Sequence, residues 1–127
     1  VENPNGPADW IANDPRIVAD HAGDMFNTFD TTLELAYDFV QLYHFIESDE
    51  WAPMVPKNIP CYLISGDQDP CGDCGEGLYH VANLLANSGH KISVKAYSGY
   101  RHEIHNELDL RDEVEAGLIK FMDDILA

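Results

Sequence analysis

A chain of 127 residues with an apolar fraction of 45% has the length and composition of one modest globular domain, or of part of a larger one. Its 23 aspartate and glutamate residues outnumber 7 lysine and arginine residues and give a formal net charge of -16, which repels phosphate backbones and anionic membranes and so excludes a nucleic-acid partner. No apolar run approaches the roughly 18–20 residues of a membrane span, and the three cysteines, an odd and low number, favour a reducing compartment, so we expect a cytoplasmic location.

The first half of the chain is predicted to be a loop followed by helices. Residues 1–15 are rich in proline, asparagine and glycine, which is typical of a loop, and residues 16–22 are predicted to form a short helix. Residues 30–48 carry a broad apolar stripe at helical spacing, which predicts a helix that is covered on more than one side. Residues 51–60 contain several prolines and are predicted to be a linker.

Two strands and two helices are predicted to alternate in the second half. Residues 61–65, "CYLIS", form a short apolar run that is typical of a buried strand, and residues 75–88 are predicted to be a helix. Residues 91–97, "KISVKAY", alternate between apolar and polar side chains, which predicts a half-buried strand near a sheet edge. The last helix is predicted to begin near Asn106 or Asp109.

The loops that follow the two strands contain most of the reactive side chains. Two strands joined by a helix are normally parallel, and open α/β sheets have their sites at the carboxyl edge of the strands. The loops read "GDQDPCGDCG" and "SGYRHEIHNE", so we expect Asp67 or Asp69 to lie near His102 or His105. A carboxylate that accepts a hydrogen bond from an imidazole allows the second ring nitrogen to deprotonate a nucleophile. Alternatively, each histidine only forms hydrogen bonds within its loop.

These motifs carry a family resemblance. "LISGDQDP" and "YRHEIHNE", followed by an amphipathic C-terminal helix, resemble the C-terminal part of α/β-hydrolases of the monoglyceride lipase and lysophospholipase type, grouped with serine aminopeptidase S33-like hydrolases. That family has its acid in a Gly-x-x-Asp-Pro turn and its histidine in an Arg-His-Glu loop, which implies that Asp69 is the catalytic acid and His102 the catalytic base. The resemblance implies an α/β fold in which residues 1–50 are a helical remnant of the cap or lid. Residues 51–127 would then be the C-terminal part of the α/β-hydrolase core, with its last two parallel strands and their flanking helices.

The resemblance also implies a serine hydrolase that cleaves lipid-like carboxylic esters, such as monoacylglycerols or lysophospholipids, without a cofactor or a metal. The sequence has no Gly-x-Ser-x-Gly nucleophile elbow, so we expect the serine to lie in a missing N-terminal half and this chain alone to be inactive. Two strands with exposed edges are a small core, so we expect the chain to pair with that half or with a second copy. Leu33, Phe39 and Tyr43, on the helix furthest from the strands, are expected to lack partners within the chain.

The other polar residues of the two loops have plainer interpretations. Asp67 is a weaker candidate for the acid than Asp69, because its direction after the strand is less predictable. Arg101 and Glu103 are expected to be ion-pair partners that fix the loop, and His105 is expected to help open the last helix.

Cys71 and Cys74 form a Cys-x-x-Cys motif, whose spacing suits a metal clip or a redox pair. No second pair supplies the remaining ligands of a structural zinc site, so we favour incidental loop cysteines over a disulfide or a metal. The alternative interpretation, from another functional class, is that the chain is a small acidic module that binds a metal or a partner through the Cys71/Cys74 loop.

Overall fold

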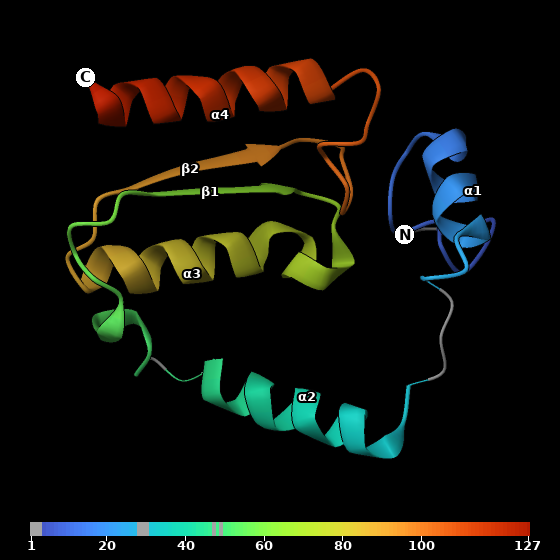
Figure 1. The fold of residues 1–127 in the computed structure, drawn as a ribbon, viewed down its shortest axis with the longest axis horizontal. Coiled ribbons are helices and arrows are strands. Elements are labelled where there is room, and N and C mark those ends of the chain that lie inside the picture. Colours follow the sequence, from blue (N-terminus) through green and yellow to red (C-terminus); the bar gives the residue numbers. More distant parts are fainter. Residues whose placement is uncertain (1–3, 28–30, 47, 49) are drawn as a thin grey trace.

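The computed structural model describes residues 4–27, 31–46, 48 and 50–127. Over these residues two parallel strands lie between helices, with α4 on one face of the sheet and α3 on the other (Figure 1). The elements in chain order are α1 (Pro15–Gly23), α2 (Leu33–Ile46), the 3-10 turn η1 (Ala52–Met54), β1 (Cys61–Gly66), the 3-10 segment η2 (Pro70–Gly75), α3 (Glu76–Asn87), β2 (Ile92–Tyr97) and α4 (Arg111–Leu126).

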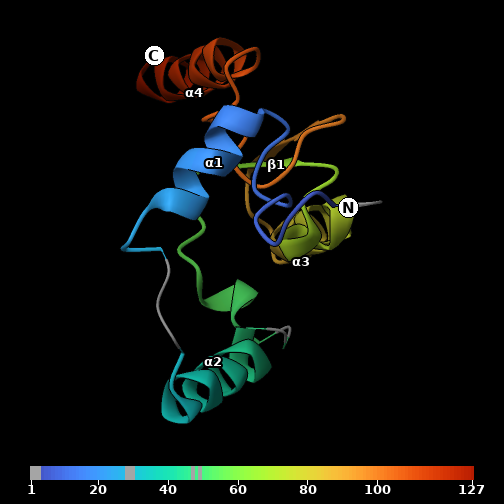
Figure 2. The same ribbon diagram turned by 90° about the vertical axis from the view of Figure 1, so that its right-hand side faces the viewer.

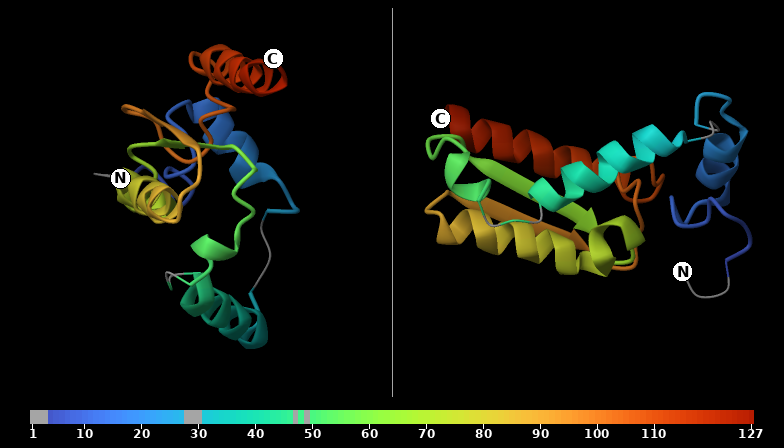
Figure 3. Two further views of the ribbon diagram at one scale, coloured as in Figure 1. Left: turned by 90° about the vertical axis from the view of Figure 1, so that its left-hand side faces the viewer. Right: turned by 90° about the horizontal axis from the view of Figure 1, so that it is seen from below.

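The two strands run parallel and in register. Cys61 pairs with Ile92 at one end and Gly66 pairs with Tyr97 at the other, and α3 makes the crossover between them. The predicted strand–helix–strand unit is therefore confirmed. Because both strands end at the same edge, the loops that follow them emerge side by side. The arrowheads of both strands point towards this edge, where α1 and the N-terminal segment also lie (Figure 3).

One cluster of the buried core lies at this edge. Tyr97, Ile104, Leu110 and Val114 form a buried cluster against which Ile64 packs. The cluster joins the end of β2, the loop after it and the first turn of α4. The loop that holds the histidines therefore rests on packed side chains.

Several element boundaries differ from the sequence-based predictions. α4 begins at Arg111, later than both predicted starts, and Leu110 before it provides no side-chain cap. The predicted linker of residues 51–60 contains a turn of 3-10 helix. In β2 the predicted apolar face is only partly covered, because the buried cluster lies at the carboxyl end of the strand and Val94 remains 36% exposed.

α2 stands apart from the sheet and its flanking helices (Figures 1 and 2). None of its described residues is buried, although the sequence predicted a helix covered on more than one side. Leu33, Phe39 and Tyr43, which were predicted to lack partners within the chain, are 91%, 50% and 58% exposed, so half or more of each side chain is left uncovered by the described part of the chain. The outer turns of α4 also leave apolar side chains half exposed, among them Met122 and Ile125. None of the described helices has both the length and the apolar character of a membrane span.

Candidate active site

Asp69 lies at the turn between β1 and η2, in the position that caps η2. Its Oδ1 accepts a hydrogen bond from the backbone N–H of Cys71 at 2.9 Å, and its backbone oxygen accepts one from the N–H of Cys74 at 2.8 Å. Proline follows directly, as it commonly does at the first position of a helix. These contacts leave the residue only 6% exposed and fix the direction of its carboxylate.

The loops after the two strands are in direct contact. A Cβ placed on Gly66 would lie 2.2 Å from the backbone oxygen of Tyr100, so this approach requires a glycine. The backbone N–H of Gln68 donates to that same oxygen at 2.9 Å, and Asp67 Oδ1 accepts from the N–H of Gly99 at 2.7 Å. Asp67, the weaker candidate for the acid, therefore ties the two loops together.

The contact between the loops brings His102 to Asp69. His102 Nδ1 and Asp69 Oδ2 are 3.0 Å apart, with the histidine side chain 43% exposed and the aspartate side chain 9% exposed. A buried carboxylate in this position accepts the Nδ1–H and leaves Nε2 for other chemistry. The indole ring of Trp10 packs beside the imidazole, with ring centroids 5.0 Å apart and planes inclined at 53°.

The pair opens into a cleft of about 370 Å³. Ile64, Ser65, Asp69, His102, Ile104, His105, Val114 and Leu118 line it. The prediction that His105 helps to open the last helix is wrong, because α4 begins only at Arg111 and His105 lines the cleft instead. The cleft thus combines an imidazole–carboxylate pair with a largely aliphatic wall.

The segment before α1 is fastened to the histidine loop. Arg101 Nη1 donates to the backbone oxygens of Asp9 and Ala12, the latter at 3.0 Å, and the N–H of Glu103 donates to the oxygen of Ile11 at 2.8 Å. The predicted role of Arg101 in fixing the loop is confirmed, but its partners are carbonyl oxygens and not a carboxylate. The neighbour of Glu103 is a histidine, since its Oε1 lies 3.7 Å from Nδ1 of His21.

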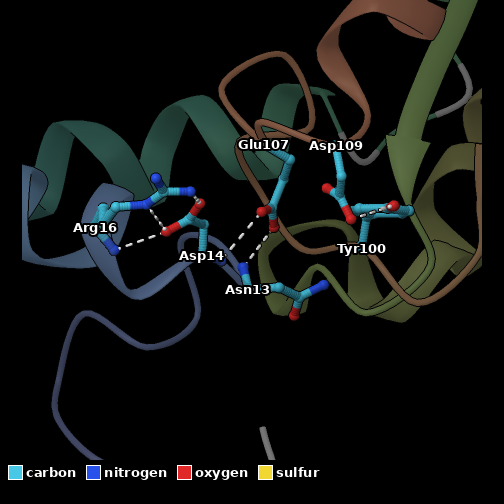
Figure 4. A network of polar contacts seen from close by, with 6 residues as sticks. All are labelled: Asn13, Asp14, Arg16, Tyr100, Glu107 and Asp109. Carbon is cyan, nitrogen blue, oxygen red and sulfur yellow. Dashed lines mark hydrogen bonds and ion pairs between the residues drawn. The ribbon is translucent and has the colours of Figure 1, made fainter.

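Glu107 completes this attachment, and its role was missed by the sequence analysis. Its side chain is almost fully buried, at 1% exposure, and accepts hydrogen bonds from the backbone N–H groups of Asn13 and Asp14 (Figure 4). Asp14 in turn caps α1 and forms an ion pair with Arg16 at 2.6 Å, which holds the pKa of the Asp14 carboxyl below its usual value. A glutamate in a polar loop gives no sequence signal of such burial.

The Cys-x-x-Cys motif does not form a disulfide: Cys71 and Cys74 are both free cysteines, and both are exposed. Partial desolvation of the thiol by the surrounding loop and, to a smaller degree, the neighbouring Asp69 carboxylate raise the pKa of Cys71 above its usual value. Cys71 belongs instead to a cluster with Asp69 and His102.

The parallel pair, the two touching loops and the acid and histidine at their tips are the arrangement of an α/β-hydrolase, and comparison with solved structures agrees. One similar structure is the crystal structure of a highly thermostable carboxyl esterase from Bacillus coagulans in complex with glycerol. It superposes on this chain with a TM-score of 0.93 at 52% identity, and the superposition covers 100% of this chain and 42% of the esterase chain. A lipase in its open form superposes with a TM-score of 0.84 at 36% identity, covering 94% of this chain and 39% of that one. The predicted α/β-hydrolase fold is confirmed.

The chain belongs to the serine aminopeptidase S33 family, whose family model matches residues 2–109. The resemblance found in the two loop motifs is thereby confirmed. No curated protein sequence matches the chain. The chain spans about two fifths of the length of each of the two solved enzymes.

Proposed function

We propose that this chain is the C-terminal part of a serine hydrolase that cleaves carboxylic esters, with Asp69 as the catalytic acid and His102 as the base. The contact of 3.0 Å between His102 Nδ1 and the buried Asp69 Oδ2 carries the proposal. The nucleophilic serine is supplied by a preceding part of the enzyme outside this chain. In this proposal residues 1–50 belong to the cap and residues 51–127 to the core.

The reaction then follows from the geometry of the pair. His102 Nε2 accepts the proton of the serine hydroxyl as the oxygen attacks the ester carbonyl, and the imidazolium returns that proton to the leaving alcohol. Asp69 stays ionised and stabilises the imidazolium through Nδ1. Water then cleaves the acyl-enzyme by the same route in reverse.

A lipid-like ester of the monoacylglycerol or lysophospholipid kind is the substrate class we propose. Two observations support it: the two similar enzymes are described as a carboxyl esterase and a lipase, and aliphatic side chains such as Ile104 and Leu118 line the cleft beside His102. An acyl chain suits such a wall because its burial removes apolar surface from water. We also propose a cytoplasmic location, with which three free cysteines agree.

A chimeric enzyme tests the proposal. The chain replaces the part of the Bacillus coagulans carboxyl esterase on which it superposes, 42% of that enzyme, and hydrolysis of monoacylglycerol and lysophosphatidylcholine is measured. We expect turnover that falls by about 10³-fold or more in the His102→Ala and Asp69→Asn variants. His80→Ala, an exposed histidine on α3, and Asp73→Asn, an exposed aspartate in η2, are the matched controls and should keep full activity.

Two results would contradict the proposal. One is a folded chimera, judged by circular dichroism and gel filtration, that hydrolyses neither ester. The other is turnover that survives His102→Ala. Cleavage of aminoacyl anilides in place of esters would assign the pair to a peptidase.

A small acidic module that binds a metal or a partner through the Cys71/Cys74 loop is the less favoured function. Family membership and the Asp69–His102 contact both support the hydrolase. In the described part of the chain the group of three or more possible ligands that contains Cys71 is made with Asp69 and His102 and does not include Cys74.

A further inference from the structure

Three different ligand types converge at the cleft. One donor atom each from Asp69, Cys71 and His102 lies within 4.8 Å of the other two. The oxygen and nitrogen of the Asp69–His102 pair are already 3.0 Å apart. The proposed hydrolysis explains the Asp69–His102 pair, but no step of that hydrolysis uses the sulfur of Cys71, which lies beside the pair.

The backbone holds Cys71 beside the pair. Its N–H donates to Asp69 Oδ1, so the cysteine cannot move away without breaking the cap of η2. Asp73 and Cys74 adopt left-handed backbone conformations, with φ of 49° and 50°, so the chain turns sharply between the two cysteines.

The donor set matches the preferences of a borderline-soft divalent cation. Zinc is bound by cysteine sulfur, histidine nitrogen and carboxylate oxygen at about 2.0–2.3 Å, and three protein ligands with one open position are typical of its accessible sites. Tetrahedral ligands at these lengths lie roughly 3.3–3.7 Å apart. Atoms within 4.8 Å of one another need to close by about 1 Å, which rotation of the exposed Cys71 and His102 side chains allows.

We propose that Asp69, Cys71 and His102 form a binding site for Zn²⁺ or a similar thiophilic divalent cation. Binding needs the thiolate, so one proton leaves Cys71 as the metal–sulfur bond forms. The bound cation takes a carboxylate oxygen and an imidazole nitrogen as ligands, which withdraws both side chains from general base chemistry. This consequence rests on the proposed function, whereas binding of the cation does not.

Cobalt binding by the intact chain tests the site, because a Co²⁺–thiolate bond absorbs in the near ultraviolet and does not require hydrolysis. We expect one Co²⁺ per chain, displaced by Zn²⁺, with the thiolate absorption lost in Cys71→Ser. Cys74→Ser is the matched control, an exposed cysteine in the same segment, and should keep the absorption. His102→Ala keeps the cysteine and should weaken Co²⁺ affinity by about tenfold or more. Circular dichroism checks that each variant is folded.

The outcomes separate the proposal from its alternatives. Absorption that is lost in Cys74→Ser, alone or together with Cys71→Ser, identifies a Cys-x-x-Cys clip and overturns the site. No thiolate absorption at millimolar Co²⁺, or an affinity unchanged in His102→Ala, overturns it as well. An inactive chimera would refute the hydrolase and leave the cobalt result standing, so the two proposals fail independently.

Discussion

Two buried carboxylates, Asp69 and Glu107, organise the carboxyl edge of the sheet. Asp69 accepts from the N–H of Cys71 and lies against His102, and Glu107 accepts from the backbone of the segment that precedes α1. Each satisfies backbone donors that would otherwise be left without partners. Glu107 thereby holds the segment that carries Trp10 against the histidine loop.

Replacing Glu107 with glutamine should loosen this attachment. Asn13 and Asp14 donate to different oxygens of the carboxylate, Oε1 and Oε2, so in glutamine one of the two N–H groups would face an amide NH₂ and lose its acceptor. We therefore expect the unfolding free energy to fall by about 1–3 kcal/mol. Urea unfolding measures the loss, and hydrogen exchange at Asn13 and Asp14 should quicken. The control Glu115→Gln, on an exposed position of α4, should change stability by less than about 0.5 kcal/mol. Unchanged exchange at Asn13 and Asp14 would show that Glu107 does not hold the segment.

Cys71 should react slowly with alkylating reagents near neutral pH. Partial desolvation first, and the Asp69 carboxylate second, raise the pKa of its thiol, so less thiolate is present at any given pH than in a free cysteine. The pH–rate profile for iodoacetamide, followed at Cys71 by mass spectrometry, should therefore be displaced to higher pH than that of a cysteine peptide. In Asp69→Asn the displacement should shrink but persist, since the partial desolvation of the thiol remains. A profile equal to that of the peptide would contradict this account.

The crossover from β1 through α3 to β2 positions the site because it aligns the ends of the strands. Gly66 ends β1 opposite Tyr97, and the loop after β2 passes over it so closely that its carbonyl oxygens occupy the space of a side chain. The packed cluster of Tyr97, Ile104 and Val114 supports that loop from below. The geometry of the Asp69–His102 pair therefore depends on the contact between Gly66 and the loop after β2, although neither Asp69 nor His102 takes part in that contact.

Gly66→Ala should separate the two loops. The new methyl group would lie 2.2 Å from a backbone oxygen, which must move, and we expect a loss of about 1–3 kcal/mol in unfolding free energy. The Asp69–His102 hydrogen bond should lengthen or break, which the NMR signal of the His102 Nδ1–H reports. Gly6→Ala, where no heavy atom lies within 4 Å of the new carbon, is the control. Equal unfolding free energies of the two variants would show that the loops can move apart without a loss of stability.

The molecule as a whole leaves apolar surface without cover. α2 buries none of its described residues, and the outer end of α4 exposes Met122 and Ile125. A two-stranded sheet also keeps unpaired backbone groups at both edges. Surface of this kind suits a chain that spans about two fifths of the similar solved enzymes.

The isolated chain should therefore associate as its concentration rises. Analytical ultracentrifugation should show this, and amides of α2 should exchange quickly at low concentration. The triple variant Leu33→Ser, Phe39→Ser and Tyr43→Ser should be more monomeric and, because these side chains are exposed, nearly as stable as the original chain. A compact monomer at every concentration with well-protected amides in α2 would show that the chain closes its own core.

The isolated chain should also show no turnover of short p-nitrophenyl esters, because its sequence has no nucleophile elbow. Spectrophotometric assay of the purified chain measures this. Activity that survives purification and disappears in His102→Ala would require a nucleophile within these residues.

The amino-acid sequence alone determined the alternation of strand and helix after residue 60, the parallel pairing and the approach of the two loops, whereas the choice of Asp69 and His102 within those loops came from the family resemblance. Hydrophobic periodicity marks the elements, and a helical crossover leaves the strands parallel, so loops at their ends must meet. These properties are local, or follow from connection rules that need no knowledge of packing.

Tertiary structure decided the rest. The burial of Glu107, the carbonyl partners of Arg101 and the packing of Trp10 on His102 join residues that are far apart in the chain and that no periodic pattern links. The late start of α4 follows the same logic, since Leu110 is held in the buried cluster with Ile104 while the residues between them form turns. Local signals describe each segment by itself, whereas the partners of a buried polar group depend on which distant segment supplies them.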